Sequence, residues 1–275
     1  MPDLADLPRI LERVIGLAMH AGRLIEAELA RPEGPRGGGD KAQVDIEIEG
    51  MLRPGLMQLL ECDFAGEETG ISLSGDAFCW VVDPNDGTAD FLQGTPGSAV
   101  AIGLLHNGLP VLGVVYAPVT DRGRDCIAWA QGLPTLLRNF QPVERDLSSS
   151  SLTTGTLIFV STAAASKPHL NAELCQPASF YPMPSIAYRL ARVAAGDGVA
   201  AVSLYNVSTH DVVAAHALLR AVHGDIWDER GQPLRYKSPA HFMRSPQFCF
   251  GGAPAACAEL MGRPWQSVLM SDSAK

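Results

Sequence analysis

The first part of the chain carries apolar residues at helical spacing. Over residues 7–30 apolar positions recur every three or four residues, which predicts one amphipathic helix that ends before Pro32. A second helix is predicted over residues 44–60, with a kink or break at Pro54, because proline removes a backbone donor. The Pro- and Gly-rich segment between these helices, residues 32–39, is expected to be a loop.

Continuous apolar runs then indicate buried strands. They are predicted over residues 77–82, 98–105 and 110–117, and Asn107-Gly108 predicts a tight hairpin between the last two. Residues 119–155 are expected to be irregular, ending in a Ser/Thr-rich link between two halves of the chain.

The second half mixes short strands with helices. Strands are predicted over residues 156–161 and 198–204, and helices over residues 186–195 and 210–222. Because strands and helices do not alternate strictly, the pattern favours an α+β or layered α/β fold over a doubly wound sheet.

Composition narrows the classes of partner. The 275 residues, 47% hydrophobic, can bury the core of one large or two small domains, and the net charge of -9 disfavours a nucleic-acid polymer. A small phosphorylated ligand stays compatible with this charge, since a metal can supply positive charge.

We expect no membrane partner and a cytoplasmic location. No apolar run approaches about 18 residues, no signal pattern opens the chain, and the six cysteines contain no CxxC.

Residues 80–88, sequence WVVDPNDGT, predict a turn that carries two carboxylates. The strand ends on Asp83, and Gly87 allows a sharp turn, so Asp83 and Asp86 are expected to converge with the carbonyl of Asn85. Such hard oxygen ligands suit Mg²⁺, and a short helix after Gly87 would offer free N–H groups to an anion. The alternative is an ordinary surface turn, because every residue in it is a turn former.

Two further acidic segments bear on that choice. Glu67 lies in a Gly-Glu-Glu sequence upstream of the strand, where a solvated surface is the alternative interpretation. Asp211 opens the helix over 210–222 and is ordinarily a capping residue, but this helix is apolar on nearly all faces. A charge at the start of such a buried helix is costly unless it is neutralised, for instance by a metal.

These three segments, residues 66–68, 80–88 and 210–215, resemble the inositol monophosphatase superfamily of Mg²⁺-dependent, lithium-sensitive phosphatases. Weaker similarities, at residues 44–49, 109–118, 184–189 and 221–224, extend the resemblance over about residues 40–235. The resemblance implies a layered αβαβα sandwich of the inositol monophosphatase and fructose-1,6-bisphosphatase type. It also implies one phosphatase domain over 1–275. The N-terminal half of this domain, residues 1–150, would be α+β and would carry most metal ligands. The C-terminal half, residues 151–275, would be α/β and would carry the last metal Asp and the substrate side. A homodimer is expected by analogy.

The resemblance also assigns roles to residues. Glu67, Asp83 and the carbonyl of Asn85 would hold an activating Mg²⁺, and Asp83, Asp86 and Asp211 a second, with two or three ions per site. Thr88, with Asp45 behind it and Glu67 on the metal side, would orient the attacking water of an in-line displacement. The phosphate and the rest of the substrate would contact a larger set: Asp86, Gly87, Thr88, Lys41, Ser185, Arg189 and His210.

Several positions depart from the pattern of the family. Asn85 replaces an aliphatic residue, which should be tolerated if only its carbonyl binds metal, and the Thr usual shortly before Asp45 is missing. His210 stands where Trp is common. No acidic residue within 202–207 can grip an inositol, which counts against myo-inositol phosphate as the substrate.

Other interpretations stay open at this point. Arg189 is a candidate for a second substrate phosphate, with a surface ion pair as the alternative, whereas His216 is expected to be packed. The segment 34–41 fails as a phosphate-binding P-loop, although Lys41 could swing toward the site. The predicted function is hydrolysis of a small phosphomonoester: an inositol-phosphate-like compound, a sugar or polyol phosphate, or histidinol phosphate. The alternatives are a 3′(2′),5′-bisphosphate nucleotidase and a non-catalytic, metal- or ligand-binding descendant.

Overall fold

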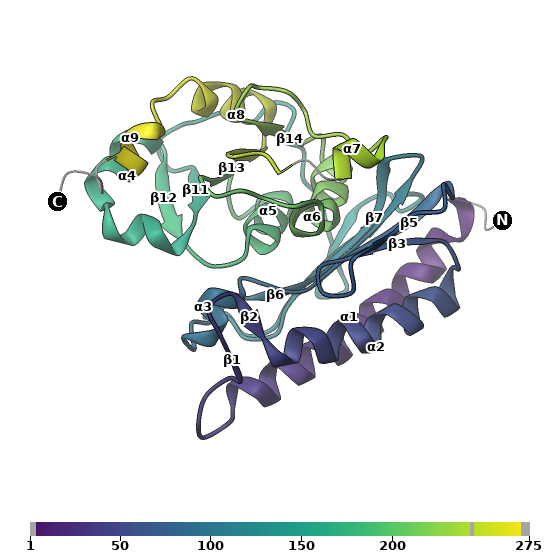
Figure 1. Ribbon diagram of the computed structural model, residues 1–275. Coiled ribbons are helices and arrows are strands. Elements are labelled where there is room, and N and C mark those ends of the chain that lie inside the picture. Colours follow the sequence, from purple (N-terminus) through teal and green to yellow (C-terminus); the bar gives the residue numbers. More distant parts are fainter. Residues whose placement is uncertain (1–3, 243–244, 271–275) are drawn as a thin grey trace.

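Helices and sheets alternate in layers in the computed structural model of the chain, which describes residues 4–242 and 245–270 (Figure 1). Helices α1 (Leu7–Leu29) and α2 (Gln43–Leu59) cover one face of an eight-stranded sheet. Helices α5 (Ile186–Ala194) and α6 (Thr209–Ala221) lie between this sheet and a five-stranded one. On the far side of the smaller sheet lie α4 (Pro168–Cys175) and α8 (Pro254–Met261) (Figure 1). The predicted αβαβα sandwich is confirmed.

The larger sheet has the strand order β10-β9-β8-β7-β6-β5-β3-β4, and only β3 and β5 pair in parallel. Its strands are β3 (Asp63–Gly66), β4 (Ile71–Ser72), β5 (Phe78–Asp86), β6 (Ala99–His106), β7 (Leu109–Ala117), β8 (Asp125–Ala130), β9 (Leu136–Arg138) and β10 (Gln141–Val143).

The smaller sheet has the order β12-β11-β13-β15-β14, with β11 parallel to both of its neighbours. Its strands are β11 (Leu157–Val160), β12 (Ser179–Pro182), β13 (Ala200–Ser203), β14 (Asp225–Asp228) and β15 (Cys249–Gly252). The remaining elements are the hairpin β1 (Gly37–Gly38) and β2 (Lys41–Ala42), the short helices α3 (Thr88–Leu92), α7 (Pro239–Phe242) and α9 (Gln266–Met270), and two 3-10 turns, η1 (Leu4–Asp6) and η2 (Thr162–Ser166).

Both faces of the eight-stranded sheet are buried, which explains the continuous apolar runs of its central strands. Along β5, Trp80 and Val82 pack toward α1 and α2, whereas Cys79 and Val81 belong to the core that contains α5 and α6. The C-terminal end of strand β5 therefore lies in the interior of the molecule. Within the described residues, no helix combines the length and apolar character needed to cross a membrane.

The strongest periodic segments form the elements that were expected. Helices α1, α5 and α6 and strands β6 and β7 match their predicted ranges within about two residues. The hairpin between β6 and β7 is also confirmed, with Asn107 and Gly108 at φ values of 50° and 74°. Strand β5 is longer than predicted, because it runs through the whole Asp-Pro-Asn-Asp segment to Asp86.

Two expectations about local structure are wrong. Residues 119–155 are not simply irregular, because β8, β9 and β10 extend the large sheet there. Strands β9 and β10 have three residues each, too few for a recognisable alternation. Helix α2 continues through Pro54 without a break. Pro54 has no backbone N–H, so the carbonyl of Gly50 lacks its usual helical hydrogen-bond donor. Gly50 is exposed, and water can donate to this carbonyl instead.

Candidate active site

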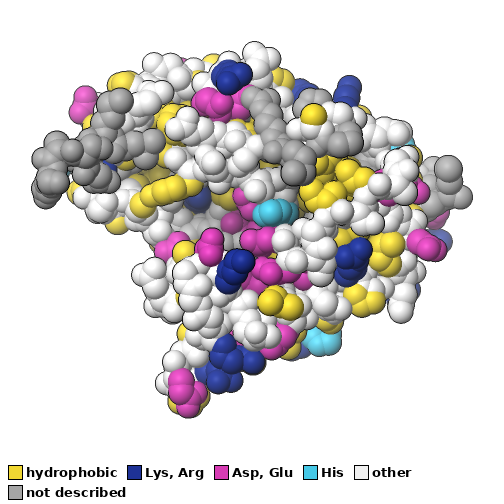
Figure 2. Space-filling view, in the orientation of Figure 1, with side chains coloured by type: hydrophobic (Ala, Val, Ile, Leu, Met, Phe, Trp, Pro, Cys, Tyr) yellow, Lys and Arg dark blue, Asp and Glu magenta, His cyan; other side chains and the backbone are white. Residues whose placement is uncertain are grey.

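The end of β5 lies in a cavity of about 640 Å³ between the two halves of the sandwich. Acidic side chains gather at the centre of this face of the molecule (Figure 2). Eight of the twelve predicted site residues line the cavity: Glu67, Asp83, Asp86, Gly87, Thr88, Ser185, Arg189 and Asp211.

Carboxylates from three separate segments converge there. One oxygen each of Asp83, Asp86 and Asp211 lie within 4.8 Å of one another. A second group, formed by Glu67, Asp83 and His210, meets the same limit, so Asp83 belongs to both. The pairing of β5 with β6 is irregular between Asp83 and Asp86, and this bulge lets two residues of one strand contribute to the same cluster.

Burial and mutual repulsion make it energetically unfavourable for all of these carboxylates to be ionised without a cation. Burial raises the pKa of Asp83 well above its usual range, and nearby Glu67 and Asp86 add to the effect. Burial likewise raises the pKa of Glu67 and that of Asp211, each to about 7. Within the described residues no salt bridge joins Glu67, Asp83 or Asp86 to a Lys or Arg. Hard oxygen donors gathered in this way fit Mg²⁺.

Asp86 also fixes the start of helix α5. Its Oδ2 atom accepts hydrogen bonds from the Ser185 hydroxyl and the Ala187 amide, both at 2.6 Å. Ser185 adopts a φ of 47°, which is uncommon for a residue with a side chain. Gly87 lies against it with a φ of 96°, and a Cβ there would be 3.0 Å from the Ser185 nitrogen. The predicted turn thus packs against a segment about 100 residues away.

Asp45, Asn85 and Thr88 form a buried hydrogen-bonded group behind the carboxylates. The Thr88 hydroxyl contacts Asp45 Oδ2 and the Asn85 carbonyl, each at 3.1 Å. The Asn85 side-chain amide donates to Asp45 Oδ1 at 3.0 Å, while its own Oδ1 has no partner. The Asn85 side chain therefore has a structural role of its own, which the sequence analysis did not predict. Burial raises the pKa of Asp45 to about 6, against the effect of these hydrogen bonds.

Glu49 is a site residue whose role sequence reasoning missed. Its side chain is fully buried and accepts hydrogen bonds from the amides of Glu68 and Thr69 at 2.9 and 2.7 Å. A Cβ on Gly66 would lie 2.2 Å from its Oε1 atom. Glu49 thus holds the loop that carries Glu67. Its one signal is its place four residues after Asp45, on the same face of α2.

The other predicted residues lie at varying distances from the carboxylates. Lys41 is exposed on β2, and its neighbour Asp40 lines the cavity instead. His210 lies at the site, with Nε2 3.3 Å from an oxygen of Asp211, and burial lowers its pKa. His216 is buried, as expected, between Tyr236 and Asp225.

Arg189 is not the surface ion pair considered as an alternative. It is 5% exposed, and its guanidinium donates to the carbonyls of Val202 at 2.6 Å and Ser185 at 3.3 Å. Burial lowers its pKa to about 10. These hydrogen bonds join α5 to β13, so Arg189 stabilises the wall of the cavity.

Comparison with known proteins identifies the family. A profile of the inositol monophosphatase family matches residues 6–251, so the chain belongs to that family and is a phosphoric monoester hydrolase. It is 30% identical to a probable inositol 1-monophosphatase, ImpA, of Mycobacterium tuberculosis, over 72% of this chain and 74% of that protein. A histidinol-phosphatase of the same organism is 37% identical over 38% of this chain and 40% of its own length. The structure of an inositol monophosphatase from Anabaena (Nostoc) superposes with a TM-score of 0.71 at 22% identity, covering 96% of both chains.

Proposed function

We propose that this protein is a Mg²⁺-dependent phosphatase that hydrolyses a small phosphomonoester by in-line attack of water. The observation that carries the proposal is the convergence of Asp83, Asp86 and Asp211 beside a buried Thr88–Asp45 pair. Glu67, Asp83 and the Asn85 carbonyl would hold one ion, and the three aspartates a second. Bound Mg²⁺ would supply the positive charge that activates a water and stabilises the leaving oxygen.

The residues of the chain then have distinct tasks. Thr88 gives its proton toward Asp45 and the Asn85 carbonyl, which leaves a hydroxyl lone pair for a proton of the attacking water. That contact would orient the water for attack on phosphorus. The backbone N–H groups of Gly87 and Thr88 would hold the phosphate, and Ser185 and Ala187 keep Asp86 in place by their hydrogen bonds.

The identity of the substrate is the finer part of the proposal. The names of the relatives point to inositol 1-phosphate and histidinol phosphate, and a sugar or polyol phosphate fits the same carboxylate site. The absence of an acidic side chain within 202–207 disfavours a tightly gripped inositol. Hydrolysis of a 3′(2′),5′-bisphosphate nucleotide is the second candidate. Lithium sensitivity and a homodimer are proposed from the family resemblance alone, and a cytoplasmic location from the sequence pattern described above.

The first test is phosphate release from p-nitrophenyl phosphate with Mg²⁺ and with EDTA. We expect turnover only with Mg²⁺, inhibition by Li⁺ and Ca²⁺, and near-total loss in Asp86→Asn, which removes a charge from the aspartate cluster. The matched control, Asp146→Asn, changes a carboxylate exposed at the surface and should retain full activity. Full activity of Asp86→Asn, or of the wild type in EDTA, contradicts the mechanism.

A further inference from the structure

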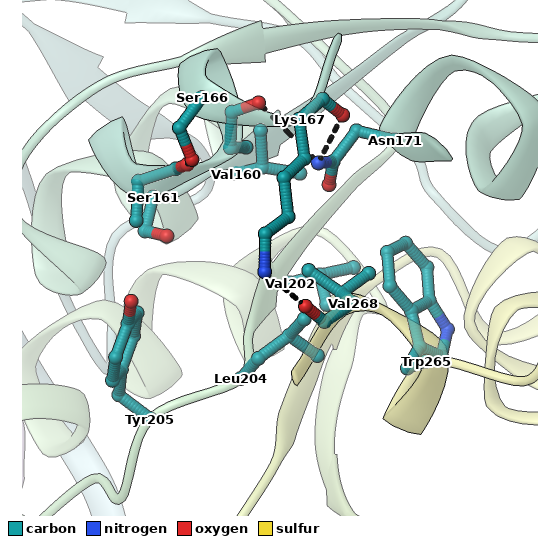
Figure 3. A pocket seen from close by; sticks show the side chains of 12 residues that line it. Val160, Ser161, Ser166, Lys167, Asn171, Val202, Leu204, Tyr205, Trp265 and Val268 are labelled. Carbon is teal, nitrogen blue, oxygen red and sulfur yellow. Dashed lines mark hydrogen bonds between the residues drawn. The ribbon is translucent and has the colours of Figure 1, made fainter. Parts of the chain in front are cut away.

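A second, smaller cavity, of about 70 Å³, lies beside the active-site cavity and plays no part in the mechanism above (Figure 3). Its walls come from elements far apart in the sequence: Val160 at the end of β11, Val202 on β13, Leu204 and Tyr205 after β13, and Trp265 and Val268 near the C-terminal end. In Figure 3, Ser161 and Tyr205 lie on one side and Trp265 on the other.

The apolar walls of this pocket are fixed in place. Trp265 is 1% exposed, and its indole N–H donates to the Leu260 carbonyl at 2.7 Å. The Lys167 ammonium donates to the carbonyl of Val268, so its aliphatic stem lies along the pocket (Figure 3). Seven of the twelve residues that line the pocket are apolar, and apolar walls combined with some polar groups are the usual form of a small-molecule site.

The two cavities are neighbours. Ser161, Ala163 and Tyr205 line both of them, so these three residues form the boundary between the carboxylate cluster and the apolar pocket. Tyr205 is 55% exposed there, although aromatic residues of this size are usually more buried. A molecule whose phosphate lies at Asp83 and Asp86 would direct its organic part toward this boundary.

We propose that this pocket binds a flat aromatic ring in the alcohol portion of the phosphomonoester, which makes it the specificity site of the enzyme. This inference rests on the proposed function. Rings pack well against apolar walls and against the face of an exposed aromatic side chain, which here is Tyr205. A polyol would leave those of its hydroxyl groups that lie against Val160, Val202 and Leu204 without partners, and burying them there is unfavourable.

The test compares two substrates that differ only in the ring, 2-phenylethyl phosphate and ethyl phosphate. Both are primary alkyl esters, so their intrinsic reactivity is similar. An apolar pocket discriminates by about 10-fold or more for a group of this size, and we expect at least about a 10-fold higher kcat/KM for the phenylethyl ester. Ala163→Phe, which fills the exposed boundary, should bring the two kcat/KM values together.

Ala165→Phe is the matched control. Ala165 is exposed on the same 3-10 turn, η2, and is absent from the lining of both cavities, so its variant should keep the preference. Equal kcat/KM values in the wild type, or a preference that survives in Ala163→Phe, overturn the inference.

A binding measurement separates this inference from the proposed function. If the wild type with Mg²⁺ hydrolyses neither of these esters nor p-nitrophenyl phosphate, the proposed function fails. Broadening of the ¹H NMR lines of 2-phenylethanol by the protein, lost in Ala163→Phe and kept in Ala165→Phe, would still support the pocket. No broadening with the wild type overturns it.

Discussion

Asn85 links strand β5, which carries the proposed metal ligands, to the Asp45–Thr88 pair that we propose orients the water. Its amide holds the second oxygen of Asp45, whose first oxygen serves Thr88. In Asn85→Leu the Asp45 carboxylate would lose this restraint, and we expect kcat to fall by about 10-fold, the usual effect of a misplaced acid–base group. The midpoint of the Mg²⁺ titration should not move, because the backbone carbonyl remains.

Steady-state kinetics across a Mg²⁺ series check both expectations at once. An unchanged kcat would mean that the Asn85 side chain is only tolerated. A shifted Mg²⁺ midpoint with the same kcat would place the amide in the metal site instead.

Individual residues were predictable where their chemistry is local in sequence. Asp83, Asp86 and Thr88 occur within six residues, so their convergence could be predicted from the sequence, although it arises from a bulge in β5 and not from the expected turn. The side-chain roles of Asn85 and Arg189 were not predictable, because each depends on a partner contributed by another element, Asp45 in one case and Val202 in the other. A sequence shows that a polar residue is present, but the fold decides whether it is buried.

At the scale of elements, helix α6 approaches the large sheet closely because the facing strands carry glycine. A Cβ at Gly113 on β7 would lie 2.1 Å from the carbonyl oxygen of Ala214. Gly113→Ala must therefore displace the helix backbone, which also moves Asp211 at its start. We expect a loss of about 2 kcal/mol or more in the free energy of unfolding, measured by urea denaturation.

The control for this substitution is Gly50→Ala on α2, where an added Cβ meets nothing within 4 Å. Alanine in an open helical position should stabilise by about 0.5–1 kcal/mol. Equal effects of the two variants would show that the close packing of α6 on β7 is not a constraint.

Elements were predictable from sequence when one strong pattern covered enough residues. Helix α1 and strands β6 and β7 have such patterns, and the Asn107-Gly108 turn fixes the register of the hairpin. The strands β9, β10 and β3 have only three or four residues, and their pairing comes from neighbours that already form a sheet. The order of strands therefore required the structure, although the layered class followed from the mixture of elements and from the family resemblance.

At the scale of the whole molecule, an ion-pair network joins the central helices to the large sheet. Asp197, just after α5, accepts hydrogen bonds from Arg192 at 2.7 Å and from Arg138 of β9 at 2.9 Å. Arg138 also pairs with Asp125 of β8 at 2.7 Å. Burial alone would raise the pKa of Asp197, but the hydrogen bonds from Arg138 and Arg192 outweigh it and hold the pKa below its usual value.

This lowered pKa makes the contribution of Asp197 dependent on pH. A carboxyl group with a lower pKa in the folded state stabilises the fold above its unfolded value, near 3.8, and loses that contribution as pH falls through the folded value. Asp197→Asn should therefore lower the free energy of unfolding at pH 7 by about 2 kcal/mol, since charged hydrogen bonds from three arginines, Arg122, Arg138 and Arg192, are weakened or lost. The difference from the wild type should narrow as the pH is brought below 4.

Urea denaturation at pH 7, 5 and 3 checks the effect, with Asp146→Asn as a control whose carboxylate contacts His223 at the surface. The control curves should follow the wild type at each pH, because exposed pairs contribute little. If the deficit of Asp197→Asn stayed constant down to pH 3, the loss would come from packing. The two sheets would then be held together by the apolar contacts of α5 and α6, without help from the charge network.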